Sequence, residues 1–436
     1  MLVERGDEGF EDARVDRIFN RRLPERQPAA VVRPETEADV VAAVRLARDR
    51  GWKVAVRSGG HSWAQWSVRD DALVIDLGGL HEMEYDDATG IVTASPSTQG
   101  GAELAPYLAE RGRFFVGGHC PTVGIGGFLL QGGQGWNARG WGWAAEYVVA
   151  VDVVTADGEL VRADATRNTD LYWAARGAGP GFPGVVTRFH LQTRPLPRHF
   201  AHTVQAFDLA DFDEVMTWLH ETHASVADTV EIVALTKTDP QVAPGPILLV
   251  TALAMVDSAL EADQALAPLR KNPALERALF VLDDEPTTPE AERARQLEDN
   301  PEGHRWAVDN AWLTGPASDV VPAMRRAYTT LPNDKAFTIW FSMAPLRRLP
   351  DMAFSVQSEI YLAAYVPWED PADDERNQAW LTGAIADLAP VTVGQYFGDS
   401  DLRRRTHRCL SDDAWERLQA VCAERDPDRV FVGYLE

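Results

Sequence analysis

The chain has 436 residues, of which 45% are apolar and 25% charged, a composition typical of a globular protein with more than one domain. It carries 42 basic and 66 acidic residues, and the resulting net charge of −24 argues against a nucleic-acid partner or a basic membrane-binding surface. Its cysteines, Cys120, Cys409 and Cys422, are too few to form a disulfide framework.

The N-terminal segment is polar and acidic. Residues 1–16 contain neither the basic region nor the apolar stretch of a signal peptide. The sequence also lacks a run of about 18 apolar residues that could span a membrane. We therefore expect a cytoplasmic protein without a membrane partner, present as a monomer or a homodimer.

Short strands and helices alternate in the first quarter of the chain. Pro34 and Thr36 precede apolar residues spaced three and four apart, which predicts a helix over residues 38–47. Aliphatic runs predict strands over residues 52–57, 72–77 and 90–94, followed by a short helix over residues 102–111. This alternation favours an α/β or α+β arrangement.

Glycine becomes unusually frequent between residues 115 and 142. Such a segment is too rich in glycine for a packed helix or strand, and glycine lets a main chain approach a ligand closely. A strand is predicted over residues 147–155, and a second Gly/Pro loop over residues 177–184 leads into a strand over residues 185–191. We therefore expect backbone wrapped around a ligand in this part of the chain.

A change of composition near Pro195 and Pro197 indicates a domain boundary. Beyond it glycine is scarce, and helices alternate with longer strands. We predict helices over residues 211–223, 258–266, 377–388 and 412–424, and strands over residues 229–236, 246–255, 337–343 and 358–366.

The sequence Arg57-Ser-Gly-Gly-His61-Ser62 directly follows a predicted strand. Successive backbone N–H groups in such a turn can form an anion nest suited to a pyrophosphate. The alternative is a tight turn with a solvent-facing histidine, and the spacing alone favours neither interpretation.

A second motif runs from Gly117 to Gly127 and contains His119 and Cys120. A lone cysteine is most often a small buried hydrophobe. A catalytic Cys–His pair is disfavoured because neighbours in sequence seldom form one. The histidines and the cysteine of the two motifs lack the spacing of zinc ligands, so we expect no metal. A dinucleotide-binding fingerprint fails because Leu129 stands where its third glycine belongs.

Together, Arg-x-Gly-Gly-His and Cys-Pro-Thr-Val-Gly-x-Gly-Gly resemble the motifs of the berberine bridge enzyme-like flavin oxidoreductases, in the vanillyl-alcohol-oxidase (PCMH-type FAD-binding) superfamily. The resemblance covers residues 34–196 and resumes at residue 351. It implies an α+β fold of two domains. An FAD-binding domain would occupy residues 1–195, an antiparallel-sheet substrate domain residues 196–395, and a C-terminal return to the FAD domain residues 396–436.

The same resemblance implies FAD held by two covalent bonds. In the family the histidine bonds the flavin 8α carbon and the cysteine sulfur bonds C6, roles that fall here on His61 and Cys120. Two such links prevent cofactor dissociation and raise the reduction potential. The implied pyrophosphate contacts fall on Arg57, Ser58, Gly59, Gly60 and Ser62. The implied isoalloxazine contacts fall on Gly118, Pro121, Thr122, Gly124, Gly127, Gly132 and Gly133. Those on the adenine side fall on Gly184 and Val186.

Three positions would act on the substrate side. Family members carry an Asn-Tyr pair near the C-terminal return, where Gln395 replaces the asparagine and Tyr396 matches the tyrosine that deprotonates a hydroxyl substrate. A phenol with a pKa near 10 needs help to do so at neutral pH, and the alternative is a structural tyrosine. Val123 corresponds to the gatekeeper over flavin C4a. A valine there resembles the oxidases, a leucine marks dehydrogenases, and the alternative is plain packing.

Some features leave the substrate open. Ser355-Val356-Gln357 stands where the family has Pro-His-Arg, so no substrate assignment transfers. Glu359, Tyr361 and Tyr365 share a strand face that turns either to the pocket or to solvent. Tryptophans near both motifs either wall an aromatic pocket or pack in the core. The carboxylates expected to be surface charges are Asp351, Asp399 and Asp401.

We therefore predict an FAD-dependent oxidase acting on an alcohol or a heteroatom-adjacent C–H bond of a bulky secondary metabolite, phenolic or sugar. Tyr396 would take a proton, hydride would pass to flavin N5, and O2, the other small-molecule partner, would reoxidise the flavin to give H2O2. The alternatives are a flavin dehydrogenase that uses another electron acceptor and a non-catalytic flavin- or ligand-binding protein.

Overall fold

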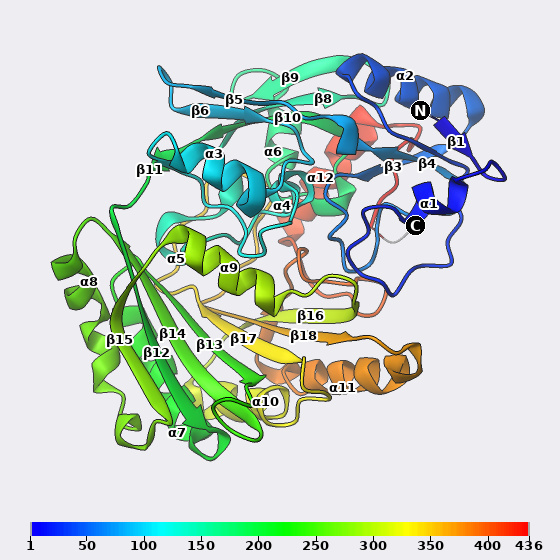
Figure 1. Cartoon of the computed structure of the whole chain (residues 1–436). Helices are drawn as coiled ribbons and strands as arrows, with labels where there is room; N and C mark the ends of the chain where they lie inside the picture. The colour runs from blue at the N-terminus through cyan, green and yellow to red at the C-terminus, as the bar shows by residue number, and fades with distance from the viewer. Residues whose placement is uncertain (1, 435–436) are drawn as a thin grey trace.

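Two lobes meet along a broad face in the computed structural model, which describes residues 2–434 (Figure 1). The upper lobe in the figure contains the N-terminal segments, and the C-terminal helix α12 (Asp412–Arg425) returns to it. The lower lobe is built on a large sheet from the middle of the chain. Among residues 2–434, no helix has both the length and the apolar character needed to cross a bilayer.

A small sheet in the upper lobe has the order β1-β2-β4-β3, and β2, β4 and β3 run parallel. Its strands are β1 (Leu2–Glu4), β2 (Ala30–Val32), β3 (Lys53–Arg57) and β4 (Ala72–Asp76). Helix α2 (Glu37–Arg50) joins β2 to β3. It begins after Thr36, whose hydroxyl accepts a hydrogen bond from the Asp39 N–H. It ends at Gly51, whose φ of 66° suits glycine. The structure thus confirms the predicted helix and both strands.

A second sheet of the upper lobe is antiparallel, with the order β5-β6-β10-β8-β9. Its strands are β5 (Met83–Asp86), β6 (Ile91–Ala94), β8 (Val148–Val154), β9 (Leu160–Asp164) and β10 (Val185–Gln192). Helices α6 (Thr169–Ala174) and α12 contribute to the same apolar core as this sheet. β6, β8 and β10 confirm the strands predicted over residues 90–94, 147–155 and 185–191.

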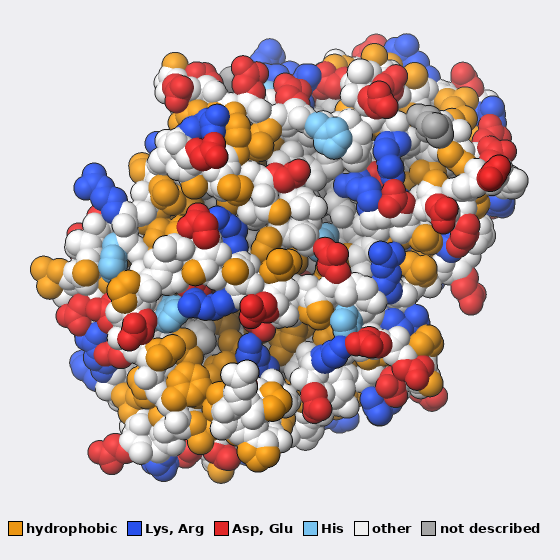
Figure 2. Space-filling view, in the orientation of Figure 1, with side chains coloured by type: hydrophobic (Ala, Val, Ile, Leu, Met, Phe, Trp, Pro, Cys, Tyr) orange, Lys and Arg blue, Asp and Glu red, His pale blue; other side chains and the backbone are white. Residues whose placement is uncertain are grey.

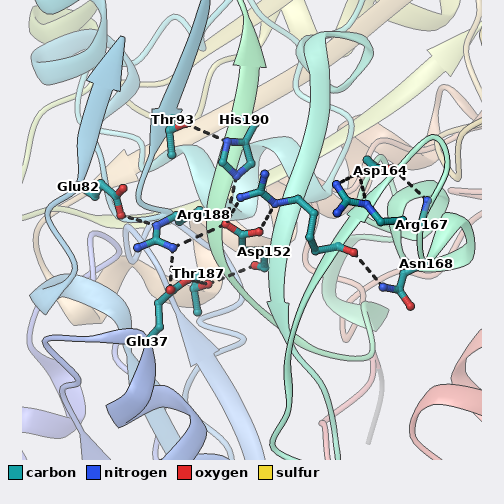
Figure 3. A network of polar contacts seen from close by, with 11 residues as sticks. Glu37, Glu82, Thr93, Asp152, Asp164, Arg167, Asn168, Thr187, Arg188 and His190 are labelled. Carbon is teal, nitrogen blue, oxygen red and sulfur yellow. Dashed lines mark hydrogen bonds and ion pairs between the residues drawn. The ribbon is translucent and has the colours of Figure 1, made fainter. Parts of the chain in front are cut away.

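A network of charged side chains ties this second sheet to α2 (Figure 3). Asp152 on β8 accepts hydrogen bonds from Arg162 Nη2 at 2.9 Å and from His190 Nε2 at 3.1 Å. Arg188, next to it on β10, donates to Glu37 Oε2 at 2.7 Å. The network therefore crosses three strands and reaches the start of the helix.

Acid should weaken this network at a pH set by Asp152. Although burial opposes its ionisation, hydrogen bonds from His190 and Arg162 lower the pKa of Asp152 to about 2. The unfolded value is about 3.9, so the stabilisation is complete above about pH 4 and is lost as the pH falls through 2. Between pH 5 and 2 we expect urea unfolding to show a loss about 1–2 kcal/mol larger in the wild type than in Asp152→Asn. The exposed control Asp87→Asn should behave as the wild type, and equal losses in all three proteins would contradict the expectation.

The large sheet of the lower lobe has the order β15-β12-β14-β13-β17-β18-β16-β19 and is antiparallel. Its strands are β12 (His199–Asp208), β13 (Val230–Thr238), β14 (Pro246–Val256), β15 (Phe280–Thr287), β16 (Arg305–Leu313), β17 (Phe337–Ser342), β18 (Ile360–Trp368) and β19 (Thr392–Gly394). One face packs against α7 (Phe212–Thr222), α8 (Ala259–Leu266), α10 (Ala317–Thr329) and α11 (Asp374–Ala386). The other face turns toward the upper lobe and α9 (Pro289–Asp299) (Figure 1).

Candidate active site

A cavity of about 740 Å³ lies between the two lobes. One wall contains both glycine-rich motifs, and the opposite wall is the face of the large sheet that the four helices leave free. Small-molecule and cofactor sites usually measure about 300 to 1,000 Å³. Two motifs far apart in sequence therefore meet at one site of suitable size.

The first motif forms a tight turn along the cavity wall. Gly60 has a φ of 79°, and a Cβ atom there would lie 1.7 Å from the Arg17 carbonyl oxygen, so the turn requires glycine. A Cβ atom on Gly59 would lie 2.5 Å from the nitrogen of Gly124 in the second motif. The backbones of the two motifs are thus in contact, and a side chain at Gly59 would push them apart.

Arg57 lines the cavity and its side chain holds the N-terminal segment, while its expected contact with a pyrophosphate stays a prediction. It is 1% exposed, and its guanidinium donates to the carbonyls of Ala13 at 3.0 Å and Asp16 at 2.8 Å. The same group lies 3.5 Å from the buried Asp76 carboxylate. Because these partners occupy the guanidinium, an anion at this turn would depend on backbone N–H groups instead.

His61 and Cys120 both line the cavity and share one hydroxyl group. The Thr122 Oγ1 lies 3.1 Å from His61 Nε2 and 3.7 Å from Cys120 Sγ. The His61 ring stacks on Phe19 with a centroid separation of 4.3 Å. Burial lowers the pKa of His61 to about 4, so its imidazole is neutral at pH 7. Burial raises the pKa of the Cys120 thiol, while the hydrogen bond with Thr122 acts in the opposite direction.

Most of the other predicted cofactor residues lie on the cavity wall: Ser58, Gly59, Gly60, Ser62, Gly118, Gly124, Gly127, Gly184 and Val186. Pro121, Thr122, Gly132 and Gly133 are not among the lining residues. A Cβ atom on Gly132 would lie 2.7 Å from the Phe354 ring, and one on Gly133 would lie 2.8 Å from the Ala144 methyl. These two glycines are therefore required for packing behind the wall.

The lining residues fit an FAD molecule. Both amide atoms of Gln134, which lines the cavity, are buried without a hydrogen-bond partner among residues 2–434. A buried amide is costly unless something pairs with it, so this donor and acceptor indicate a polar ligand. A Cβ atom on Gly127 would meet nothing within 4 Å, so this part of the wall is open to a ligand.

Helix α4 (Ile125–Leu130) forms within the glycine-rich segment, which the sequence predicted to be irregular.

Tyr396 lies on the cavity wall and is 4% exposed. Its phenol oxygen accepts a hydrogen bond from the Gln134 N–H at 3.2 Å, which joins the C-terminal return to the glycine-rich segment between residues 115 and 142. Burial raises the pKa of Tyr396 above its usual value, and the charge of Asp399 raises it further, while backbone N–H groups of Gln134 and Gly133 act in the opposite direction. The phenol therefore keeps its proton at neutral pH.

Asp399 lines the cavity, so the expectation of a surface charge is wrong for this residue. Its carboxylate accepts hydrogen bonds from the Tyr361 hydroxyl at 2.5 Å and the Trp63 indole at 3.1 Å. Burial raises the pKa of Asp399 even though these hydrogen bonds lower it. Asp351 is exposed as predicted, whereas Asp401 is largely buried and lies 3.7 Å from Arg22.

The Gln395 side chain does not line the cavity, which corrects its expected catalytic position. It is fully buried, and its Nε2 donates to Asp309 Oδ1 at 2.9 Å. Next to it, the Tyr396 N–H donates to Asn310 Oδ1 at 2.7 Å. Gln395 therefore helps to hold the segment that carries Tyr396, without contact to a ligand in the cavity.

The half-buried His119 and the buried Glu231 form a pair on the cavity wall that the sequence did not predict. His119 Nε2 lies 2.9 Å from Glu231 Oε1, and the other carboxylate oxygen accepts the Asn137 N–H at 2.7 Å. The imidazole contacts the rings of Trp136 and Phe341, with centroids 4.4 and 5.3 Å away. Only the alternation of β13, which places Glu231 on the same face as the lining residues that follow it, signals its position.

The remaining candidates divide between wall and core. Val123, Tyr361 and Tyr365 line the cavity, so the face shared by the two tyrosines turns to the pocket, whereas Glu359 is exposed and does not line it. Trp63, Trp66 and Trp136 also line it, whereas Trp141 and Trp143 belong to apolar core clusters. The cavity thus has an aromatic wall close to His61 and Cys120.

Comparison with known proteins identifies the cofactor class. A family described as "FAD binding domain" matches residues 28–164. The chain is 38% identical over 424 residues to the FAD-linked oxidoreductase janO of Penicillium janthinellum, covering 96% of this chain and 93% of that protein. It is 41% identical over 182 residues to the xylooligosaccharide oxidase of Thermothelomyces thermophilus, covering 41% of this chain and 36% of that enzyme.

Solved structures share the fold over the whole chain. The 6-hydroxy-D-nicotine oxidase of Arthrobacter nicotinovorans has a TM-score of 0.85 at 23% identity, covering 99% of this chain and 96% of the other. Berberine bridge enzyme has a TM-score of 0.83 at 18% identity, covering 100% and 95%. These similarities confirm the predicted α+β fold of the vanillyl-alcohol-oxidase superfamily. The chain belongs to the family of FAD-linked oxidoreductases, is an FAD-dependent oxidoreductase and has the fold of berberine bridge enzyme.

Proposed function

We propose that this protein is an oxidase that holds FAD by bonds to His61 and Cys120 and oxidises an alcohol, or a C–H bond next to a heteroatom, in a bulky small molecule. The observation that carries the proposal is the single cavity lined by His61, Cys120 and Tyr396. In this cavity FAD can reach the predicted attachment residues, His61 and Cys120, while a substrate reaches the predicted proton acceptor, Tyr396. The relative named as a xylooligosaccharide oxidase supports the oxidase assignment.

Bound FAD would supply a two-electron acceptor, while the protein supplies attachment and proton transfer. A neutral His61 imidazole has an unprotonated nitrogen available to bond to carbon, because burial lowers its pKa to about 4. Cys120 must lose its proton before its sulfur can bond, since the thiolate is the nucleophile. Each attachment would replace a C–H bond of the flavin, and the two electrons left on the ring would pass to O2. The Thr122 hydroxyl lies next to both groups and favours the thiolate through its hydrogen bond.

On the substrate side we propose that Tyr396 takes the proton of the substrate hydroxyl. Its oxygen is held in the cavity wall by the Gln134 N–H, a fixed geometry that favours proton transfer to a substrate beside it. Because burial and Asp399 raise the pKa of Tyr396, this role makes turnover depend on alkaline pH.

Val123 is the residue through which we expect the protein to admit O2. It lines the cavity three positions after Cys120, and its small side chain leaves space for a small oxidant. Val123→Leu adds one methylene and should slow reoxidation by about tenfold or more. Stopped-flow mixing of photoreduced enzyme with oxygenated buffer measures this step without a substrate.

Val123→Ala is the matched control and should reoxidise at least as fast as the wild type. Peroxide, measured with a peroxidase-coupled dye, should form in proportion to the reduced enzyme consumed. Slow reoxidation of the wild type, combined with fast electron transfer to an added dye, would identify the dehydrogenase alternative and overturn the oxidase proposal.

A further inference from the structure

The cavity continues beyond Tyr396 along the free face of the large sheet. Aliphatic and aromatic side chains from four strands line this part. We call them the apolar floor: Val204 on β12, Leu249 on β14, Val233 and Leu235 on β13, and Ile339 and Phe341 on β17.

The strand register places the apolar floor in two neighbouring rows. In one row Leu249 pairs with Leu235, which pairs with Ile339. In the next row Val233 pairs with Phe341, which pairs with Tyr361 at the end of the cavity that contains Tyr396. Adjacent strands lie about 4.8 Å apart and residues i and i+2 about 7 Å apart, so four strands give a strip about 14 Å wide and 7 Å long.

The side chains of the apolar floor are only partly covered by protein. Val204, Val233, Leu235 and Ile339 are half-buried, although each projects into an interior cavity. On the opposite face of the same strands, Ala234 and Trp340 are fully buried against helices. Apolar surface that stays accessible inside a cavity is stabilised by an apolar ligand.

Polar side chains lie at the two ends of this surface, where two pairs are already formed and Gln296 and Glu298 of α9 also line the cavity. The His119–Glu231 pair stands at the end near Cys120. At the other end Lys237 binds Asp299 of α9 at 2.8 Å. Within the floor, the Thr251 hydroxyl donates to the Val233 carbonyl at 3.4 Å. A sugar chain on this floor would therefore lose hydrogen bonds to water without regaining them.

The opening of this region lies beneath α9. Figure 2 shows hydrophobic side chains at the bottom of a recess below this helix, with charged side chains around it. Glu292 of α9 binds His202 at 3.2 Å, which links the helix to β12 at the rim. The charged rim and the apolar interior together suit a molecule that enters with most of its surface apolar.

We infer that the substrate carries a large, mainly hydrocarbon skeleton, such as several fused rings or an isoprenoid chain. This skeleton lies on the apolar floor, with the oxidisable alcohol or amine at the Tyr396 end. The inference rests on the proposed function and names the substrate class for it, a hydrophobic alcohol or amine in place of an oligosaccharide.

Competition for a fluorescent apolar probe tests this inference on the holoenzyme. Nile red, which brightens in apolar surroundings, should bind and be displaced by farnesol, an isoprenoid alcohol, but not by cellobiose. Leu235→Asn and the isosteric Val233→Thr should weaken farnesol binding by about tenfold or more, because each makes the floor polar. The control Leu260→Asn, at a position that is 66% exposed on α8, should bind as the wild type.

Displacement by cellobiose, or unchanged farnesol binding in both folded floor variants, would overturn the inference. Failure of the proposed function has a different signature, because covalent flavin on the acid-precipitated chain and peroxide from photoreduced enzyme do not depend on the floor. Loss of those two signals with intact farnesol competition counts against the oxidase. Intact signals with a preference for cellobiose count against the apolar substrate.

Discussion

The double variant His61→Ala/Cys120→Ala should release all of its flavin on acid precipitation, whereas each single variant should keep flavin on the polypeptide. The reason is that the neutral His61 imidazole and the Cys120 sulfur line one cavity and both contact the Thr122 hydroxyl. Absorbance of the washed pellet and the intact mass of the chain measure the retained flavin. Each single variant should also turn over about tenfold or more slowly, because it loses one electron-withdrawing bond to the ring.

Cys409→Ala is the matched control for this experiment. Cys409 is buried and, unlike Cys120, does not line the cavity, so its removal should leave covalent flavin unchanged. Thr122→Val preserves the side-chain shape and removes only the hydroxyl, so it should slow attachment without preventing it. A colourless wild-type pellet with only the calculated mass of the chain would refute covalent attachment.

Local signals in the sequence predicted the elements that position the cofactor side of the site. The Thr36 cap and the apolar spacing after it located α2, and Gly51 ends that helix. The need for glycine in the first motif could also be predicted locally, since Gly59 and Gly60 allow close backbone contacts that any side chain would prevent. Such features depend on neighbours in the chain or on one backbone conformation, so sequence reasoning can find them.

Side-chain partners from distant segments could not be predicted. The contact between His119 and Glu231 joins residues 112 positions apart, and Trp63 reaches Asp399 across 336 positions. Nothing near Asp399 in the sequence distinguishes it from the exposed Asp351. The residues that the folded chain places around a carboxylate determine its environment. They therefore also determine whether its pKa is raised or lowered.

The sequence of strand β16 departs from the regular strand pattern because two of its residues support the site. Its sequence carries Asp309 and Asn310 among apolar residues, which interrupts the expected strand pattern. In the structure Asn310 is fully buried, and its Nδ2 donates to the carbonyls of Tyr396 at 2.9 Å and Asp399 at 3.0 Å. The polar residues that interrupt the strand pattern are therefore the ones that hold the segment carrying Tyr396 and Asp399. Departures from a regular pattern can thus mark residues that support a site.

Tyr396→Phe should lower turnover by about 100-fold or more while leaving covalent flavin unchanged, because it removes only the proposed proton acceptor. The sign of the pH dependence follows from the environment of the phenol. Burial and Asp399 raise the pKa of Tyr396 above its usual value, so the phenolate is a small minority at pH 7. Turnover of the wild type should therefore rise nearly tenfold per pH unit between pH 7 and 9, and that of Tyr396→Phe should not.

Asp399→Asn provides a second, opposite test of the same proton transfer. Removing this negative charge lowers the pKa of Tyr396, so the alkaline limb should move to lower pH. Tyr328→Phe is the matched control, since its hydroxyl donates to the Ala234 carbonyl on the helix-covered face of the sheet. A flat wild-type profile with a slow Tyr396→Phe would assign the phenol to hydrogen-bond donation. Full turnover by Tyr396→Phe would remove it from the reaction, because no other effect of the variant restores a lost base.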